Sequence, residues 1–331
     1  MLNRAILSLP CLSTVFCVKY SAKIPNCPTF HFIGETHLSQ SISGSGTSPG
    51  LLIAPHGIAL ADDGSIFVAD SLNHRIQHFS ADGNLIKSWG EYANILEGEA
   101  PGGTFNEPWD LAIASDGSIY VADTWNHRIQ KFTSDGEFIR MWGDYAMSDA
   151  PTSLYGPRGI TLDDQNRIYV TDTGNKRVVI YDENGNYITQ FGGAGIEIGK
   201  MDEPVGIALD ENKQVYIADA WNRRIQVFAA DESETIYTPI NSWDVDGWYG
   251  QSINNKPYLT ISPSGVVLAT DPEASRILEF SQSGEFMRGW SGFSLSEDLS
   301  SQPCDLQFDA FGNLWVSDSA TNMLMKFTQL Q

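Results

Sequence analysis

The sequence predicts an all-β chain, a six-bladed β-propeller of four-stranded antiparallel blades, and two observations support this. The stretch from Pro108 to Gly143 recurs five more times along the chain in recognisable though degraded form. Within each copy, short alternating apolar runs are separated by Asp-Gly or Asn-Gly turn signals, which is typical of an antiparallel meander. A single such sheet cannot bury both faces, so the copies are expected to stack face to face around an axis.

In the copy that begins at Pro108, four strands are expected at residues 109–113, 119–122, 128–132 and 138–142. Asp116-Gly117 and Asp135-Gly136 provide two of the turns between them. A proline stands just before each inner strand, where a missing N–H is tolerated. These blade-opening prolines are Pro55, Pro108, Pro157, Pro204, Pro257 and Pro303.

The two ends of the chain are expected to share one blade. Thr29 to Gly34 matches the fourth strand of a repeat, and the last repeat stops after three strands at Phe327. We therefore expect Phe30 to Ile33 to pair with Leu324 to Phe327, so that an N-terminal strand completes the last blade and removes the free sheet edges. Residues 29–331 form the propeller in this interpretation, and residues 1–28 a leader, either a weak export signal or a disordered cytosolic tail.

The repeated motifs Pro-x-Gly-[Ile/Leu]-Ala, Val-Ala-Asp and Asn-[His/Arg]-Arg-[Ile/Val] resemble the NHL repeat over residues 29 to 328. The resemblance implies a β-propeller that commonly has six blades. Members of this family serve as scaffolds, RNA binders, sensors and enzymes, so the resemblance leaves the function open.

Composition narrows the choice of partner. The chain carries 41 Asp and Glu against 20 Lys and Arg, a net charge of −21, which repels nucleic acid phosphates. No apolar run reaches eighteen residues, so no transmembrane segment is expected. The chain is also expected to be a monomer. The compartment stays open between secreted or periplasmic and cytoplasmic. The four cysteines, at positions 11, 17, 27 and 304, lack metal-binding spacing, and a Cys27–Cys304 disulfide is not expected.

Two recurring sets of residues predict structural roles. An Asp closes each second strand and an Arg follows five residues later in five repeats, which predicts a bidentate ion pair in each blade. The sixth repeat has Met323 in place of Arg, which leaves the partner of Asp318 open. Bulky aromatic residues end the fourth strands and predict packing between neighbouring blades. They are Trp89, Trp142, Phe191, Trp243 and Trp290.

Residues that break the repeat are the candidates for function. The residue after each blade-opening proline is expected at the channel mouth on the top face, the face formed by the long inter-blade loops and by the turns between second and third strands. These mouth residues are His56, Trp109, Arg158, Val205, Tyr258 and Cys304, with Asp110 and Asp305 following. The turns add His74, Trp125, His127, Lys176, Trp221 and Arg223.

This set predicts a non-catalytic binding or scaffold propeller. Its acidic, aromatic-rimmed top face and channel mouth would receive a peptide, a protein or a small molecule through Trp109, Arg158, Tyr258, Trp125, Trp221, His74 and His127. No cofactor is expected.

The alternative is a channel-centred lyase or hydrolase, with Arg158 among the candidate catalytic residues. Such an enzyme would be assisted by Ca²⁺ or another divalent metal at Asp110, Asp305 and His56, or would use Cys304 with His56. Amidating lyases with this repeat resemble the chain in the Pro-His opening, and there three histidines hold Zn²⁺. Only His56 is present at the six positions here, so that site is not expected. A similarity to paraoxonase or gluconolactonase propellers would imply Ca²⁺ in the channel, for which Asp110 and Asp305 are the candidates.

Overall fold

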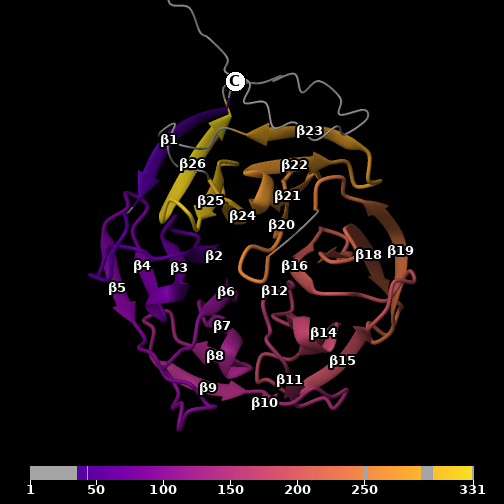
Figure 1. Ribbon diagram of the computed structural model, residues 1–331, viewed down its shortest axis with the longest axis horizontal. Helices are drawn as coiled ribbons and strands as arrows, with labels where there is room; N and C mark the ends of the chain where they lie inside the picture. Colours follow the sequence, from indigo (N-terminus) through magenta and orange to yellow (C-terminus); the bar gives the residue numbers. More distant parts are fainter. Residues whose placement is uncertain (1–35, 43, 249–251, 292–300, 330–331) are drawn as a thin grey trace, which may run out of the picture. The chain divides into compact units, whose positions relative to one another are not determined.

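The computed structural model describes residues 36–42, 44–248, 252–291 and 301–329. The chain divides into two compact units, Met1–His31 and Phe32–Gln331, and all described residues belong to the second. This unit contains six four-stranded antiparallel sheets arranged as blades around a central axis (Figure 1). The predicted fold class, a six-bladed propeller, is confirmed.

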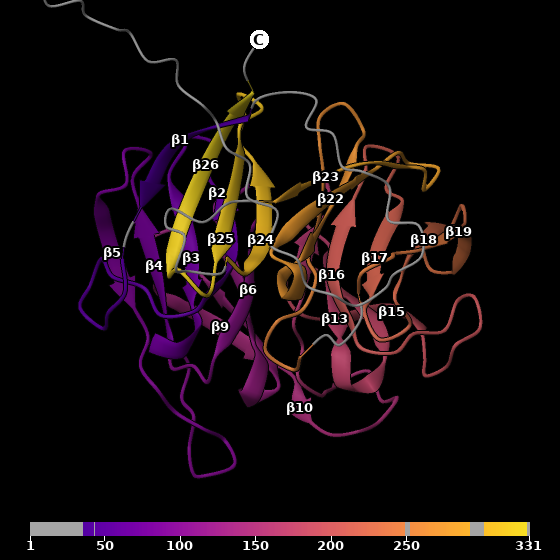
Figure 2. The same cartoon turned by 45° about the horizontal axis from the view of Figure 1, so that its top comes forward.

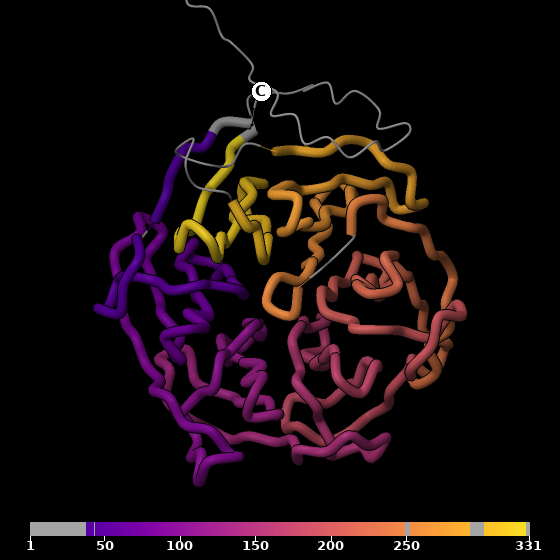
Figure 3. The backbone as a smooth tube through the Cα atoms, in the orientation of Figure 1, coloured from indigo at the N-terminus to yellow at the C-terminus, as the bar shows by residue number. Residues whose placement is uncertain are grey.

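The first three blades follow one another along the chain, each running from the innermost strand to the outermost. Blade 1 consists of β2 (Pro55–Leu60), β3 (Ile66–Asp70), β4 (Arg75–Phe79) and β5 (Leu85–Trp89). Blade 2 consists of β6 (Pro108–Ile113), β7 (Ile119–Asp123), β8 (Arg128–Phe132) and β9 (Phe138–Trp142). Blade 3 consists of β12 (Ile160–Leu162), β13 (Ile168–Asp172), β14 (Arg177–Tyr181) and β15 (Tyr187–Gly192). The backbone tube in Figure 3 shows this order.

The remaining blades complete the circle. Blade 4 consists of β16 (Pro204–Leu209), β17 (Val215–Asp219), β18 (Arg224–Ala230) and β19 (Tyr237–Asp244). Blade 5 consists of β20 (Leu259–Ile261), β21 (Val267–Asp271), β22 (Arg276–Phe280) and β23 (Phe286–Ser291). Blade 6 consists of β24 (Pro303–Phe308), β25 (Leu314–Asp318), β26 (Met323–Gln329) and β1 (Thr36–Ile42).

Short elements occupy the loops of the top face. The parallel pair β10 (Asp144–Tyr145) and β11 (Ser153–Leu154) lies between blades 2 and 3. Four 3₁₀ turns join the second and third strands of blades 1, 2, 3 and 5: η1 (Ser71–Asn73), η2 (Thr124–Asn126), η3 (Thr173–Asn175) and η4 (Pro272–Ala274). None of the helices in the described part of the chain has the length and apolar character needed to cross a membrane.

The N-terminal strand completes the last blade, as predicted. Strand β1 pairs antiparallel with β26, with Leu38 opposite Phe327 and Ile42 opposite Leu324, and the indigo and yellow strands lie side by side in Figures 1 and 2. The prediction that Phe30 to Ile33 form this strand was wrong in register. Those residues lie outside the described ones, and Leu38 to Ile42 occupy the place beside Leu324 to Phe327.

The segment Thr36–Ile42 is difficult to predict as a strand because it is mostly polar and carries a bulge. The register shifts between Leu38 and Gln40, so Leu38 and Ile42 pack into two different clusters. Ile42 is buried against Leu52 and Trp315, whereas Leu38 packs on the side of blade 5. A bulge breaks the period-two pattern by which a strand is recognised, whereas the prediction relied on the match of Thr29 to Gly34 to the fourth strand of a repeat.

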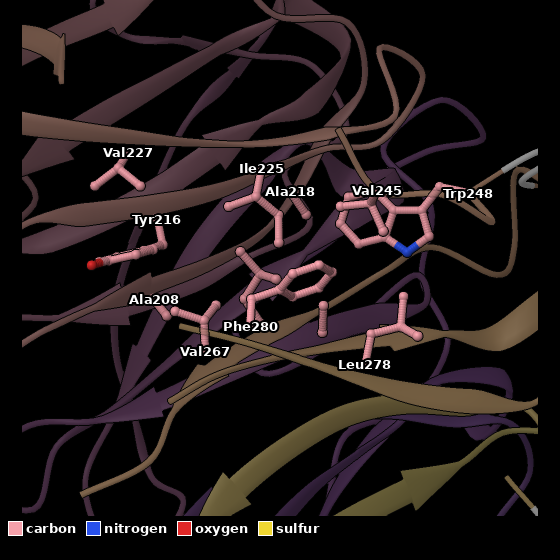
Figure 4. Packing of buried hydrophobic residues seen from close by; sticks show 12 residues of the cluster. Ala208, Tyr216, Ala218, Ile225, Val227, Val245, Trp248, Val267, Leu278 and Phe280 are labelled. Carbon is pink, nitrogen blue, oxygen red and sulfur yellow. The ribbon is translucent and has the colours of Figure 1, made fainter. Parts of the chain in front are cut away.

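The core consists of apolar layers between neighbouring blades. In the cluster of Figure 4, Ile225 and Val227 of blade 4 face Val267 and Phe280 of blade 5. The aromatic residues at the ends of fourth strands pack across the same interfaces, as predicted. Trp89 of blade 1, for example, covers Gly136 of blade 2, where a Cβ atom would lie 2.7 Å from the indole.

Each predicted Asp–Arg pair is present, with Arg Nε 2.7 to 2.8 Å from Asp Oδ2 in blades 1 to 5. The predicted bidentate geometry was wrong, because the outer guanidinium nitrogens bind other groups. In blade 1, Arg75 donates to the carbonyl oxygens of Thr47, Ser48 and Leu51 in the loop that enters the blade. The arginine therefore fastens a top loop to the sheet.

Asp318, which lacks an arginine, accepts hydrogen bonds from the Ser301 hydroxyl and from the backbone N–H groups of Gln302, Ala320 and Thr321. These donors replace the guanidinium in blade 6.

Candidate functional site

The mouth residues of blades 1, 2 and 3 form a continuous stack on the inner rim. The His56 and Trp109 rings are parallel, with centroids 4.3 Å apart, and the Arg158 guanidinium lies 4.1 Å from the Trp109 ring centre. All three side chains are buried, with Arg158 only 4% exposed. Each of the three residues follows the blade-opening proline of its blade, Pro55, Pro108 or Pro157.

Both ring nitrogens of His56 lie within hydrogen-bond distance of other groups. Its Nδ1 lies 2.9 Å from Ser71 Oγ and 3.0 Å from the Ala54 carbonyl oxygen, and its Nε2 lies 3.1 Å from the carbonyl oxygen of Asn254. Asn254 belongs to the loop before β20, which reaches the centre of the ring in Figure 1. Burial lowers the pKa of His56 to about 4, so the imidazole is neutral at pH 7.

Tyr258 closes the channel. It precedes β20 of blade 5, yet its hydroxyl donates to the carbonyl oxygens of Trp109 at 3.3 Å and Arg158 at 3.5 Å, on blades 2 and 3. Blades 2 and 5 stand on opposite sides of the ring (Figure 3), so the phenol side chain crosses the central hole. Burial raises the pKa of Tyr258 well above its ordinary value, which keeps the phenol protonated.

Asp110 and Asp305 link neighbouring inner strands. The Asp110 carboxylate accepts the N–H groups of Leu111 and of Ile160 in the next blade, at 2.8 and 2.9 Å. Asp305 does the same with Leu306 and Ile58. Burial raises the pKa of Asp305 to about 7, and burial together with the Asp305 charge raises the pKa of Asp110 well above its usual range.

These carboxylates form part of no metal-binding cluster in the described chain. Over residues 36–42, 44–248, 252–291 and 301–329, no group of three or more His, Cys, Asp or Glu side chains could hold a metal ion. The carboxylate oxygens of Asp110 and Asp305 instead accept the backbone N–H groups described above, so their bonds are those of structural links.

Cys304 is fully buried, and its thiol lies 3.6 Å from the carbonyl oxygen of Gln302, which accepts its hydrogen. Burial raises the pKa of Cys304 to about 12, so the thiol is protonated at neutral pH. The hydrogen bonds of His56 go to other groups, so the two side chains proposed as a thiolate–imidazole pair do not bond to each other.

A pocket of about 160 Å³ opens on the top face beside this stack. It lies where blades 2, 3 and 4 meet the loop before β20. Aromatic and apolar side chains form its walls, and Arg158 and Glu203 are its charged residues. The lining residues are Trp125, Tyr155, Gly156, Arg158, Thr173, Gly174, Glu203, Trp221 and Ile253.

Two buried cationic side chains, one lining this pocket and one packed on its Trp221 wall, each have a nitrogen atom without a hydrogen-bond acceptor among the described residues. These atoms are the Arg158 Nη1 nitrogen and the Lys256 Nζ nitrogen. Lys256 is 0% exposed, and its ammonium lies 4.9 Å from the centre of the Trp221 ring that forms one wall. Burial lowers the pKa of Lys256 to about 8, so the side chain is mostly charged at pH 7.

Lys256 was missed in the sequence because it lies in a loop outside the repeat. The residues before the six blade-opening prolines are Ala54, Glu107, Gly156, Glu203, Lys256 and Gln302. Lys256 is the one cation in this set, and that difference is a signal that could have found it.

The turn residues proposed for binding divide into two kinds. Trp125 and Trp221 line the pocket; Trp125 donates its indole N–H to Glu107 at 3.0 Å, and Trp221 is 50% exposed. His74 and His127 instead hold loops, because their Nδ1 atoms accept the N–H groups of Glu107 at 3.1 Å and Gly156 at 2.9 Å. These histidines position the loop ahead of the next blade.

The comparisons with known proteins agree with the repeat and the fold. The family model described as NHL repeat matches four segments, residues 52–79, 105–132, 154–181 and 201–228. The chain is an NHL-repeat β-propeller. The four matches cover the inner three strands of blades 1 to 4, and the degenerate blades 5 and 6 complete the ring of this NHL-repeat propeller.

Among curated relatives, a probable peptidyl-alpha-hydroxyglycine alpha-amidating lyase of Caenorhabditis elegans is 30% identical over 120 residues, which are 35% of this chain and 33% of that protein. Protein brain tumor of Drosophila melanogaster is 30% identical over 123 residues, which are 37% of this chain and 11% of that protein. The NHL-repeat propeller thus spans about a third or less of the length of these relatives.

Among solved structures, virginiamycin B lyase from Staphylococcus aureus superposes with a TM-score of 0.60 at 17% identity, over 89% of this chain and 100% of that chain. At this identity the likeness is one of fold.

Proposed function

We propose that this NHL-repeat propeller is a non-catalytic binding module whose ligand site is the top-face pocket between Trp125, Arg158 and Trp221. The ligand is a small molecule or the end of a peptide. The observation that supports this most is the combination of aromatic walls with buried polar groups that lack partners. Apolar pockets with a few convergent polar groups are the usual form of a ligand site.

The position of the pocket favours the top-face loops, rather than the central channel, as the location of the ligand site. Tyr258 crosses the central hole, and the loop at Asn254 lies over His56, so a ligand in the pocket would contact the loops of blades 2 to 4 instead. Loops carried by a rigid scaffold are a common location for binding sites.

Binding of single-ring aromatic fragments, followed by saturation-transfer NMR, tests the proposal. Trp125→Ala and Trp221→Ala should each weaken fragment binding about tenfold or more while leaving the melting temperature close to that of the wild type. Phe311→Ala is the matched control, because Phe311 is an exposed aromatic residue in a turn of blade 6 and does not line the pocket. Fragment binding that survives both tryptophan substitutions would place the site elsewhere.

A channel-centred lyase or hydrolase is the second candidate. The raised pKa values of Asp110 and Asp305 favour it, since a carboxyl such as Asp305, whose pKa is about 7, is suited to general acid–base chemistry. The lyase names of some relatives agree with it. Metal analysis of the purified protein separates the candidates: a stoichiometric divalent ion that is lost on Asp110→Ala would support the enzyme.

A further inference from the structure

Arg158 lines the pocket, and the Lys256 ammonium lies over the ring of Trp221, which forms one of its walls. Burial, together with a smaller effect of the Arg158 charge, lowers the pKa of Lys256. The Arg158 guanidinium also lies 5.8 Å from the centre of the ring of Trp125, another lining residue. Burying two cations costs free energy unless anionic groups compensate their charges.

The acidic side chains nearby are engaged by other groups. Glu203 Oε1 lies 2.6 Å from the Lys176 ammonium, and its Oε2 forms a long ion pair with Arg158 Nη1, at 3.9 Å, which is beyond hydrogen-bond distance. Asp202 also pairs with Lys176, at 3.0 Å. Glu107 accepts the Trp125 indole N–H. The donors Arg158 Nη1 and Lys256 Nζ are therefore left for an acceptor from outside the described chain.

We propose that the pocket binds the anionic oxygen group, a carboxylate or a phosphate, of a ligand with a small aromatic or apolar body. This inference rests on the proposed function and adds the ligand class. Arg158 and Lys256 donate charge-assisted hydrogen bonds to the anion. Trp125, Tyr155, Trp221 and Ile253 pack against the body.

The size of the pocket limits that body. An apolar cavity of about 150 Å³ accommodates one benzene ring, and this pocket measures about 160 Å³. The ligand therefore inserts a group of about one ring, and any larger part lies outside the pocket toward the exposed Trp221 and Ile253.

Isothermal titration calorimetry with four probes tests the inference: benzoate, phenyl phosphate, the uncharged benzamide and inorganic phosphate. Each probe is titrated into the wild-type protein, Arg158→Gln, Arg158→Lys and Lys256→Met. Lys213→Met is the matched control, since it removes one positive charge from a residue that pairs with Asp164 and Glu234 away from the pocket. A thermal melt of each variant confirms that it is folded.

Benzoate or phenyl phosphate should bind the wild type at least tenfold more tightly than benzamide. Whichever of the two binds more tightly identifies the anion as carboxylate or phosphate. Arg158→Gln and Lys256→Met should each weaken that binding about tenfold or more, Arg158→Lys should weaken it less than Arg158→Gln, and Lys213→Met should leave it unchanged.

Three results would overturn the inference. If benzamide and benzoate bound equally tightly, the anionic group would play no part in recognition, although the pocket would remain the ligand site. If inorganic phosphate bound as tightly as phenyl phosphate, the apolar body of the ligand would contribute nothing to binding. A wild-type protein that binds none of the aromatic anions would exclude this ligand class, whereas the proposed function itself fails only if fragment binding does not depend on Trp125 and Trp221.

Discussion

Burial of the Lys256 ammonium destabilises the folded protein when no ligand is bound. This ammonium lies 4.9 Å from the centre of the Trp221 ring. The charged side chains that act on it are Glu203, Arg158, Lys176 and Asp202. A cation over an aromatic face recovers about 0.5–1 kcal/mol, less than the several kcal/mol that an ion loses on burial in a protein. The structure retains this charge at the wall of its top-face pocket, which is the place where a bound anion would compensate it.

Lys256→Met should stabilise the ligand-free protein by about 1 kcal/mol at pH 7. The pKa of Lys256 is about 8 in the folded chain against 10.5 in the unfolded one. Between these values the unfolded state binds more protons, so this residue makes wild-type stability rise as pH increases from 8 to 10.5. Urea unfolding at pH 7, 9 and 10.5 should show a difference between variant and wild type that is largest at pH 7. A difference that grows with pH would contradict this account.

The Cys304 thiol should react with iodoacetamide far more slowly than an exposed cysteine, because it is buried and its pKa is raised to about 12. Mass spectrometry that resolves each cysteine measures this directly in the native protein, and the same reaction in urea gives the reference rate. Fast alkylation of Cys304 in the native state would instead support the nucleophilic alternative.

At the residue scale, the sequence could predict which side chains differ from the repeat but not which of them share a pocket. Arg158, Trp125 and Trp221 were among the candidates and line the pocket. Cys304 was also a candidate, and its thiol is buried. His56 was a candidate too, yet its ring is covered by the loop at Asn254, whose path the repeat does not encode. Lys256 was overlooked for the same reason, since its loop folds over the channel.

The element that recurs most strictly is the turn between the second and third strands, with an arginine that joins a sheet to the loop before it. Arg177 in blade 3 binds Asp172, Gln190 and the carbonyl oxygens of Ala150 and Ser153. The periodic Asp and Arg predicted the pair. The loop carbonyls that complete the guanidinium come from segments of variable sequence, so the bidentate expectation failed.

Arg177→Met should lower the free energy of unfolding by about 3–5 kcal/mol, since it removes the guanidinium that pairs with the buried Asp172 carboxylate and donates to two carbonyl oxygens. Arg276→Met is the internal comparison and should cost about half as much, because the Arg276 side chain is 19% exposed against 2% for Arg177. Guanidinium unfolding curves measure both values. Equal losses in the two variants would show that burial does not set the strength of this contact.

At the scale of the whole molecule, ring closure depends on one strand that is distant in sequence from its blade. Strand β1 covers the edge of β26, and Ile42 fills an apolar cluster with Leu52, Trp315 and Leu324. The repeat count and the missing fourth strand of the last repeat predicted this closure. The bulged, polar sequence of β1 made its register unpredictable, which explains the error of position.

Deletion of residues 1–42 should expose the β26 edge and the Ile42 site, lowering the free energy of unfolding by at least about 3 kcal/mol and promoting aggregation. Deletion of residues 1–31 is the control, because it keeps β1. Size-exclusion chromatography and urea unfolding compare the two proteins. A 1–42 deletion as stable and monomeric as the control would contradict the role given to β1.

The most direct test of the central claim, that the ligand site is the cationic pocket on the top face, is a crystal structure of the protein soaked with benzoate. We expect the carboxylate within hydrogen-bond distance of Arg158 Nη1 and Lys256 Nζ, with the ring between Trp125 and Trp221. Benzoate bound in the channel beside Asp110 and Asp305, with no density in the pocket, would contradict the account.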